Sequence, residues 1–454
     1  MTPSNNYPAT LAAIAPDTLD ALRRKARFVI DEAARQGADA AEAAISAGEG
    51  LSVTVRLGEV ETLEFNRDRS VVVTVFVGQC KGSASSSDDA ESSLCETVAA
   101  AMAIARQTGA DPHNGLAPAE ALARDLPDLD LHHPWSLTPE QAIDMALACE
   151  NAGRRDARIV NSEGATVSSH AGARIYANSH GFCDGWRSTQ HSLSCVLVAE
   201  QDGAMQRDYW YDSQRDATVL QAPEVVGERA ARRTLARLGA SRPATAELPV
   251  LFAPEVAKGL IGHFVSAISG GALYRKASFL RDRIGSQVFP EWVTIRERPH
   301  LPRGSASAPF DSDGLPTREQ AFVQDGVLVS YALGLYASRR LGMAPTGNGG
   351  GVRNLTLTHG EEDQAALCRR MDKGILITEV MGQGVNLVTG DYSRGASGFR
   401  VENGEIAGPL EEFTIAGHLG EMFAGLQVVG SDVDRRGNIH CGSLLLSPMK
   451  IAGI

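Results

Sequence analysis

Apolar residues change their spacing within the first 80 positions of this sequence, from the period of a helix to the period of a strand. Across Leu19–Ala33 they recur every three or four residues, which places them on one face of a helix. Across Leu51–Val55 they alternate with polar residues, as in a strand with one buried face. We therefore expect a helix followed by an antiparallel meander, with turns at Leu57-Gly58 and at Asn66–Ser70.

The same two periods recur up to about residue 240. Helical patterns cover 90–108, 139–152 and 224–238, and a second β region covers 158–211. Within that β region, Asn161–Gly164 and Asn178–Gly181 have the composition of tight turns, so two hairpins are expected. Residues 1–16 show neither period, and we expect them to be irregular.

A polar segment at 239–248, GASRPATAEL, is the best domain boundary in the sequence. We expect domains at 1–240 and 241–454. After the boundary the strand-like runs are short, and Asp325-Gly326 and Asn403-Gly404 are hairpin signals. Helical patterns there are limited to 258–269 and 363–371. The predicted fold class is α+β, with an N-terminal domain of helices packed on antiparallel sheet and a mainly antiparallel β C-terminal domain, barrel-like or sandwich-like.

The composition of the chain disfavours several classes of function. The chain has 454 residues, 43% hydrophobic residues and a formal net charge of −12, which favours a soluble protein and disfavours binding to nucleic acid or to an anionic membrane. No segment reaches the roughly 18 consecutive apolar residues of a membrane span. The first 15 residues lack the basic region of a secretory signal, and the seven cysteines contain no C-x-x-C pair, so we expect a cytoplasmic protein with reduced thiols.

Common catalytic and nucleotide-binding motifs are absent from the sequence. We find no G-x-G-x-x-G after a strand, no P-loop, no G-x-S-x-G and no H-E-x-x-H. The glycine-rich stretch Pro345–Gly351 does not open a helix, and no Lys-Ser/Thr pair follows it. A structural or substrate-facing loop is therefore a better interpretation than a phosphate site.

The C-terminal half resembles the TldD/PmbA family, also called modulators of DNA gyrase. The order and spacing of several motifs match over about 200 residues, and the N-terminal pattern also fits. The ending NIHCGSLLLSPMKIAG is similar to the PmbA (TldE) type and not to the TldD type. The matching stretches are Leu273–Ser278, Asp313–Thr317, Met343–Gly349, Ser397-Gly398, Glu402–Ile406 and Asn438–Gly453.

The resemblance implies that a zinc motif has been lost. TldD-type members carry H-E-x-x-x-H on the helix before the conserved basic pair, with a third ligand, a cysteine, near the C-terminus. Counting back from Arg275-Lys276, the two histidine positions fall on Gly262 and Ala267, the general-base position falls on His263, and the cysteine corresponds to Cys441. One thiolate alone does not form a zinc site, so we expect no cofactor in this chain.

Two further residues, Thr346 and Asn348, match a family loop that either faces the peptide or shapes the barrel. His263 as a substitute base and Cys441 as a reactive thiol are the candidate catalytic residues, each weighed against a simple packing role.

The resemblance also implies a partner. PmbA-type proteins pair with a TldD-type subunit, and the complex is a cytoplasmic metallopeptidase that trims unfolded peptides, including leader peptides of modified peptide antibiotics and an antitoxin. We expect this chain to be the non-catalytic, chamber-forming half, with zinc in the TldD-type partner, and to form a homodimer when alone. The alternatives are an independent peptidase that uses Cys441 or His263, and a non-enzymatic protein that modulates gyrase or an RNA-binding regulator.

Overall fold

The computed structural model describes residues 16–454, which form two compact units. The N-terminal unit comprises the chain up to Glu200, Arg207–Leu235 and Pro309–Pro316, and the C-terminal unit comprises Gln201–Gln206, Ala236–Ala308 and Thr317–Ile454. The expectation of an irregular N-terminus concerns residues 1–15, which lie outside the described residues. Pro16 already belongs to the first helix.

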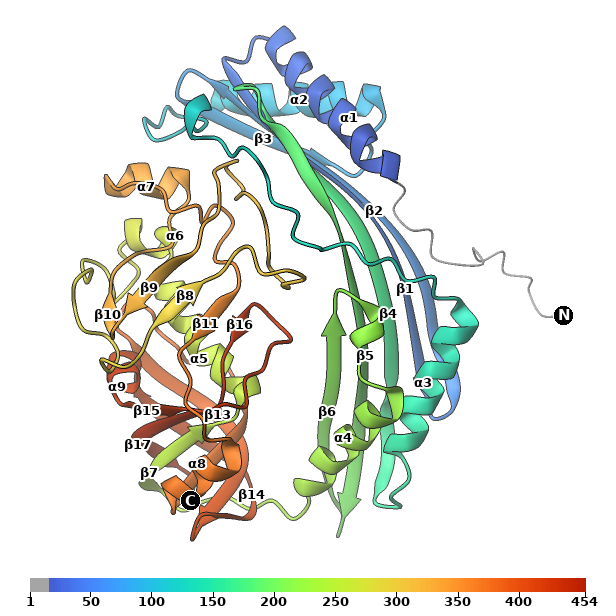
Figure 1. Ribbon diagram of the computed structural model, residues 1–454, viewed down its shortest axis with the longest axis vertical. Helices are drawn as coiled ribbons and strands as arrows, with labels where there is room; N and C mark the ends of the chain where they lie inside the picture. The colour runs from blue at the N-terminus through green and yellow to red at the C-terminus, as the bar shows by residue number, and fades with distance from the viewer. Residues whose placement is uncertain (1–15) are drawn as a thin grey trace, which may run out of the picture. The chain divides into compact units, whose positions relative to one another are not determined.

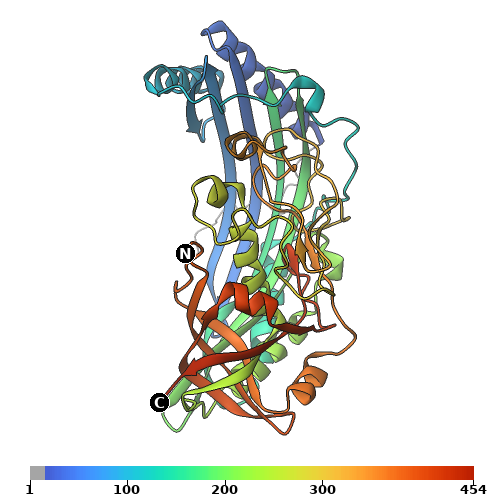
Figure 2. The ribbon, with the colours of Figure 1, turned by 90° about the vertical axis from the view of Figure 1, so that its left-hand side faces the viewer.

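A six-stranded sheet forms the N-terminal unit, with the strand order β3-β2-β1-β4-β5-β6. Its long strands run side by side along most of their length (Figures 1 and 2). The predicted turn at Leu57-Gly58 is confirmed, because both residues have positive φ angles, 53° and 85°. The strands are β1 (Ala40–Arg56), β2 (Glu59–Val77), β3 (Cys80–Ser86), β4 (Ile159–Asn178), β5 (Cys183–Gln201) and β6 (Ala204–Gln214).

Strand β2 continues through Asn66–Ser70, so the turn predicted there is wrong. These residues pair in antiparallel register with Ser46–Gly50 of β1. Strand β3 pairs only with Val71–Val77, so the first part of β2 is an edge of the sheet within the described residues. The charged run Arg67–Arg69 suits an exposed edge, where charges disfavour pairing with another chain. In the sequence, the same polar composition resembles a turn.

Of the two turns predicted in the second β region, one is confirmed and the other is wrong. Asn178–Gly181 forms the turn between β4 and β5, and Gly181 has a φ of 93°. Asn161–Gly164 instead lies inside β4, where the pairing with β5 shifts register twice. A Cβ atom at Gly164 would lie 2.8 Å from Thr54 and 2.9 Å from the carbonyl oxygen of Val55, so this glycine permits close approach of two strands at a bulge.

Helices cover one face of this sheet, and the predicted ones are confirmed to within a few residues. Helices α1 and α2 pack near one end of the sheet and α3 near the other (Figure 1). Helix α3 begins with a capping box in which Thr138 and Gln141 bond each other's backbone. The helices are α1 (Pro16–Arg35), α2 (Glu91–Gln107), α3 (Pro139–Gly153) and α4 (Pro223–Ala236), with 3₁₀ turns at Ala119–Ala121 and Ala217–Val219.

The segment Pro309–Pro316 belongs to the N-terminal unit although the chain on both sides of it belongs to the other unit. The ring of Phe310 lies 4.8 Å from that of Phe182 and 5.1 Å from that of Trp186. The carbonyl oxygen of Gly314 accepts a hydrogen bond from the backbone nitrogen of Ala123 at 2.9 Å. The segment therefore completes an aromatic cluster of the N-terminal unit.

The C-terminal unit contains a β-barrel. A sheet with the order β14-β13-β12-β7-β17-β15 closes on itself because β14 also pairs with β17. Strands β12 and β7 pair in parallel and the other printed pairings in this sheet are antiparallel. The strands are β7 (Ala246–Phe252), β12 (Gly374–Met381), β13 (Asp391–Glu402), β14 (Glu405–His418), β15 (Leu426–Val429) and β17 (Leu444–Ala452).

A second, five-stranded sheet in this unit has the order β10-β9-β8-β11-β16. The two predicted hairpins of the unit are confirmed: Asp325-Gly326 joins β9 to β10, and Asn403-Gly404 joins β13 to β14, all four residues having positive φ angles. The strands are β8 (Ile295–Glu297), β9 (Gln320–Gln324), β10 (Val327–Leu328), β11 (Leu355–Leu357) and β16 (Ile439–His440).

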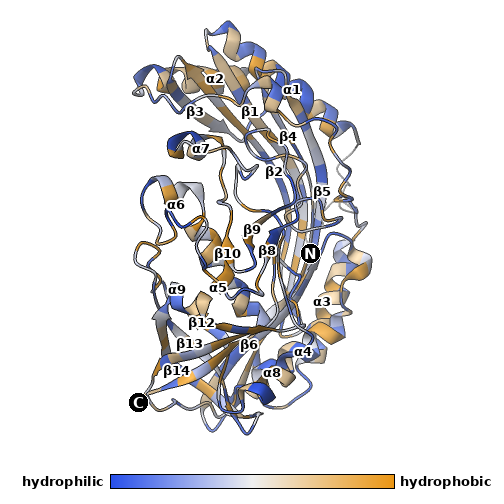
Figure 3. Cartoon of the chain, turned by 60° about the vertical axis from the view of Figure 1, so that its left-hand side comes forward, coloured by the Kyte–Doolittle hydropathy of each residue, from blue (hydrophilic) through white to orange (hydrophobic). Residues whose placement is uncertain are grey.

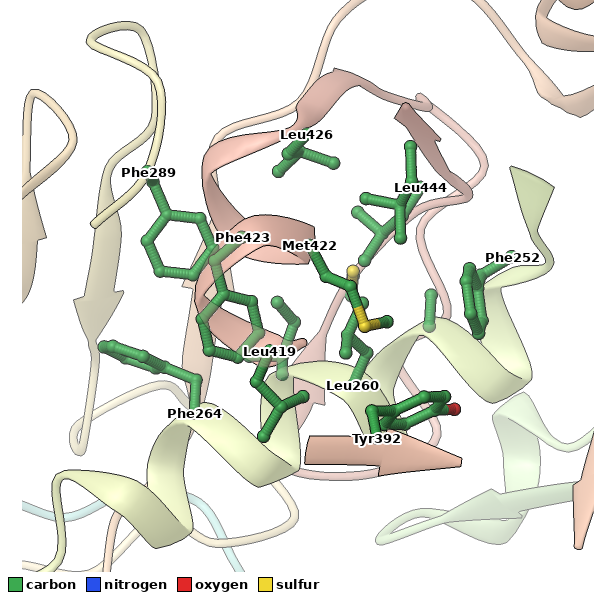
Figure 4. Packing of buried hydrophobic residues seen from close by; sticks show 14 of the residues in the cluster. Phe252, Leu260, Phe264, Phe289, Tyr392, Leu419, Met422, Phe423, Leu426 and Leu444 are labelled. Atoms are coloured by element: carbon green, nitrogen blue, oxygen red, sulfur yellow. The ribbon is translucent and has the colours of Figure 1, made fainter. Parts of the chain in front are cut away.

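Helix α5 and its surroundings form the core of the C-terminal unit. Figure 3 shows hydrophobic colour over much of α5. Its Phe264 lies 5.3 Å from Phe289 and 5.9 Å from Phe423, measured between ring centroids (Figure 4). Two helices were predicted here; three shorter ones, of five to seven residues, were missed because they are too short to show a period. The helices are α5 (Pro254–Ala267), α6 (Gly270–Tyr274), α7 (Leu335–Leu341), α8 (Gln364–Met371) and α9 (Leu419–Ala424).

The predicted fold class is confirmed: α+β in the N-terminal unit and a β-barrel in the C-terminal unit. Among the helices of residues 16–454, none has the length and apolar character needed to cross a membrane.

Candidate functional site

The positions predicted from the zinc motif lie on α5. The helix begins with Pro254 after Ala253, and its buried residues face the barrel core. Gly262 and His263 are half-buried, and Ala267 is fully buried in that core. The helix is therefore formed and anchored as a motif-bearing helix would be, but its side chains differ.

Gly262 faces the strand that precedes Cys441. A Cβ atom built at Gly262 would have one neighbour within 4 Å, the Cδ1 atom of Ile439 in β16, at 4.0 Å. Helix α5 packs against β16. The fold thus brings Gly262 toward the segment that carries Cys441.

The residues at these positions do not fit a zinc ion. Gly262 has no side chain and Ala267 has only a methyl group, so neither supplies a donor atom. Within residues 16–454, no three His, Cys, Asp or Glu side chains are grouped so that they could hold a metal ion. No metal-dependent step can be derived from this chain.

Cys441 is fully buried and held as a thiol. Its Sγ donates to the carbonyl oxygen of Gly442 at 3.2 Å. Burial raises the pKa of the Cys441 thiol well above its usual range, and the charges of Asp432 and Asp434 act in the same direction. Since the thiolate is the reactive form, this environment disfavours nucleophilic chemistry at Cys441.

His263 lies beside Tyr392 of β13. The two rings meet edge to face, with centroids 6.0 Å apart. Burial lowers the pKa of His263, and the charge of Arg394 lowers it further, so the imidazole is neutral at pH 7. Burial also raises the pKa of Tyr392 to about 12. A neutral imidazole can accept a proton.

An ion-pair cluster next to Cys441 was missed by sequence reasoning. The carboxylate of Asp434 accepts from Lys258 of α5 at 2.9 Å and from Arg436 at 2.9 Å. Its backbone nitrogen donates to the carbonyl oxygen of Cys441 at 3.0 Å. Burial opposes ionisation, but the bonds from Arg436 and Lys258 outweigh it and hold the pKa of Asp434 well below its usual range. The cluster fixes the loop before β16 to α5.

Thr346 and Asn348 belong to a buried polar network centred on Glu297, which is 1% exposed. Asn348 Nδ2 donates to both carboxylate oxygens of Glu297, at 2.8 and 3.0 Å, and its Oδ1 accepts from Thr346 Oγ1 at 2.7 Å. Gln320 Nε2 and the backbone nitrogen of Arg353 donate to the same carboxylate, at 2.7 and 2.5 Å. The side chain of Asn348 is thus engaged inside the unit, where it holds the glycine-rich loop to β8.

The comparisons with known proteins cover almost the whole chain. Residues 41–105 match domain 1, residues 132–238 the central domain and residues 245–453 the C-terminal domain of the PmbA/TldA metallopeptidase family. Metalloprotease PmbA of Escherichia coli O157:H7 is 48% identical over 93% of this chain and 94% of its own length. A PmbA homologue of Haemophilus influenzae is 45% identical over the full length of both.

More distant relatives include the TldD side of the family. A protein named zinc metalloprotease TldD homologue, from Saccharolobus solfataricus, is 28% identical over 44% of this chain and 48% of its own length. A crystal structure from Bacteroides thetaiotaomicron, described as a proposed modulator of DNA gyrase, aligns with a TM-score of 0.91 at 25% identity over 97% of this chain and 100% of the other. TldE of Thermococcus kodakarensis, with a TM-score of 0.81 at 19% identity over 96% of this chain and 99% of the other, shares the fold.

Proposed function

Because this chain belongs to the PmbA/TldD metallopeptidase family and is of the PmbA type, we propose that it is the subunit without a zinc site in a two-subunit peptidase. The observation that supports the proposal is that Gly262 and Ala267 of α5, to which the resemblance assigns two zinc-ligand positions, offer no donor atom. A TldD-type subunit would supply the zinc and its activated water.

The proposed role of this chain is to close the proteolytic chamber and to position extended peptide substrates in the cytoplasm. Unfolded peptides are the proposed substrate class, including leader peptides of modified peptide antibiotics and an antitoxin. Extended peptides bind by pairing with strand edges, which are available on a unit built from several short strands. Thr346 and Asn348 would contribute by holding the glycine-rich loop in shape rather than by direct contact through Asn348.

The independent-peptidase alternative has less support. Cys441 is buried and its pKa is raised, and neither feature suits a nucleophile. The solved structure from Bacteroides is described as a proposed gyrase modulator, and within residues 16–454 we find no geometric feature that favours binding to gyrase.

Three preparations test the proposal: the chain alone, a TldD-type protein alone, and the two co-expressed. We expect co-purification of the pair, zinc in the pair but not in the chain alone, and cleavage of an unfolded peptide only when the TldD-type protein is present. Elemental analysis, light scattering and a fluorogenic peptide assay provide the readouts. A Cys441→Ser variant is the control for thiol-dependent cleavage.

Either of two results would remove the proposal. About one tightly held zinc per isolated chain would show that a metal site exists without the partner. Peptide cleavage by the isolated chain, lost in Cys441→Ser, would establish the independent peptidase.

Self-association is part of the same proposal. Without a partner, the surface of this chain that would contact a TldD-type subunit would pair with a second copy of the chain through an isologous interface. An obligate contact of this kind buries more than about 2,000 Å² in total. A chain that is strictly monomeric and does not bind a TldD-type protein would contradict the proposed subunit role.

A further inference from the structure

A cationic hollow is lined by residues of the five-stranded sheet and of the loops next to it, all within the C-terminal unit. Its volume is about 600 Å³. Arg296 of β8 pairs in register with Thr356 of β11, and Thr356 pairs with His440 of β16, so these three side chains form one row across three strands. Arg298 and Arg435 also line the hollow.

The charge of this hollow is uniformly positive. Of its lining residues, all in the described part of the chain, three are arginines and none is acidic. Within residues 16–454, Arg296 donates to the neutral amide of Gln324 at 2.8 Å, and no carboxylate pairs with Arg296 or Arg435. Arg298 pairs with Glu319 at 3.2 Å, but both side chains are largely exposed, and an ion pair of that kind is weak enough to be displaced.

His440 lies in the same hollow. Burial lowers its pKa most, and the charges of Arg435 and Arg298 lower it further, although a bond to the Gly437 carbonyl and the charge of Asp434 oppose this. His440 is therefore neutral at pH 7. The three arginines supply the cationic character of the hollow.

We propose that this hollow, through the juxtaposed Arg296, Arg298 and Arg435, binds the carboxylate groups of an extended peptide. The planar guanidinium group donates two parallel hydrogen bonds to a carboxylate. The volume suits a short peptide segment, while the net charge of −12 disfavours a long polyanion. The choice of a peptide rests on the proposed function.

The test measures binding directly, with the isolated full-length chain and fluorescent decapeptides. Three probes separate the sources of the carboxylate: an amidated peptide with glutamates, the same peptide with glutamines, and the glutamine peptide with a free C-terminus. We expect at least one carboxylate-bearing probe to bind about tenfold or more tightly than the fully neutral one, since a charge-assisted bidentate contact has roughly that effect on affinity. Whichever probe binds identifies side-chain or terminal recognition.

Variants then locate the site. Arg296→Gln and Arg435→Gln should each weaken binding of the carboxylate probe about tenfold and leave the neutral probe unchanged. Arg400→Gln is the matched control, because Arg400 is a half-exposed arginine of the same unit that pairs with Glu402 outside the hollow. Circular dichroism melting confirms that each variant is folded, and Arg296→Lys retains the charge without the fork geometry if the glutamine variant unfolds.

Three results would overturn the inference: equal binding of acidic and neutral probes, hollow variants that bind like the wild type, or displacement of the acidic probe by inorganic phosphate but not by acetate at equal concentration. These outcomes are separate from the co-expression test. A chain that forms an active complex but does not discriminate the probes loses only the inference. A chain that binds the acidic probe but does not associate with a TldD-type protein loses only the proposed function.

Discussion

Replacing Asn348 by aspartate should destabilise the C-terminal unit more than replacing it by alanine. The Asn348 amide donates to both oxygens of a Glu297 carboxylate that is 1% exposed. Alanine removes these bonds to a charged acceptor, at a cost of about 2 kcal/mol. Aspartate removes the same donors and places a second carboxylate against the first, and an uncompensated buried charge raises the cost to about 4 kcal/mol.

Scanning calorimetry can resolve this difference. A domain of this size class loses roughly 2–4 °C of Tm per kcal/mol, which predicts a fall of about 4–8 °C for Asn348→Ala and about 8–16 °C for Asn348→Asp.

The control is Asn403→Asp, the same change of charge in an exposed hairpin turn of the same unit. Its stability should stay within about 0.5 kcal/mol of the wild type. Equal losses in the alanine and aspartate variants, or a control as damaging as Asn348→Asp, would refute the view that Asn348 acts as a donor to a buried charge.

The remaining predictions concern Gly262 of α5, Cys441 and Asp434. Gly262→Ala should raise stability by about 0.5–1 kcal/mol in chemical denaturation, because its Cβ meets nothing closer than 4.0 Å and alanine is the better helix former; a loss would show that the glycine is sterically required. Cys441 should resist iodoacetamide at pH 8 in the native protein and react after denaturation, as peptide mass spectrometry can show, whereas the partly exposed Cys80 should react in both states. Asp434→Asn should cost about 3 kcal/mol at pH 7, since the buried carboxylate that accepts from Lys258 and Arg436 is lost. Because the folded pKa of Asp434 lies below the unfolded one, the wild-type advantage should shrink as the pH falls from 5 toward 2, and a constant difference in urea midpoints would argue against this origin.

Hairpin turns were the features most easily predicted from the sequence, and the two wrong predictions of local structure were also turns. Asp325-Gly326 and Asn403-Gly404 were identified because both residues of each pair adopt positive φ angles that few other residues accept. Asn161–Gly164 has a similar composition but serves a bulge inside a long strand. A cluster of Asn, Asp and Gly indicates that the backbone departs from regular strand geometry. It does not show whether the chain reverses direction there or continues through a bulge.

The arrangement of the site depended on distant pairs that no local pattern reveals. The candidate positions on α5 were assigned by counting back from Arg275-Lys276 in a family motif, and their role stays a prediction. The bond from Asn348 to Glu297 joins residues 51 positions apart, and that from Lys258 to Asp434 joins residues 176 apart. Charged and amide residues are usually solvated, so their sequence neighbourhoods gave no reason to expect burial.

The placement of Pro309–Pro316 in the N-terminal unit has a consequence for how this protein is made. On the ribosome, the rest of that unit has been synthesised once Leu235 is added, but Phe310 follows only after roughly 75 more residues, which takes about 4–15 s at typical elongation rates. During that interval the rings of Phe182 and Trp186 await the residue that packs against them. A nascent chain in this state offers an exposed aromatic surface that chaperones can bind, and a fragment ending near residue 240 would retain that surface permanently.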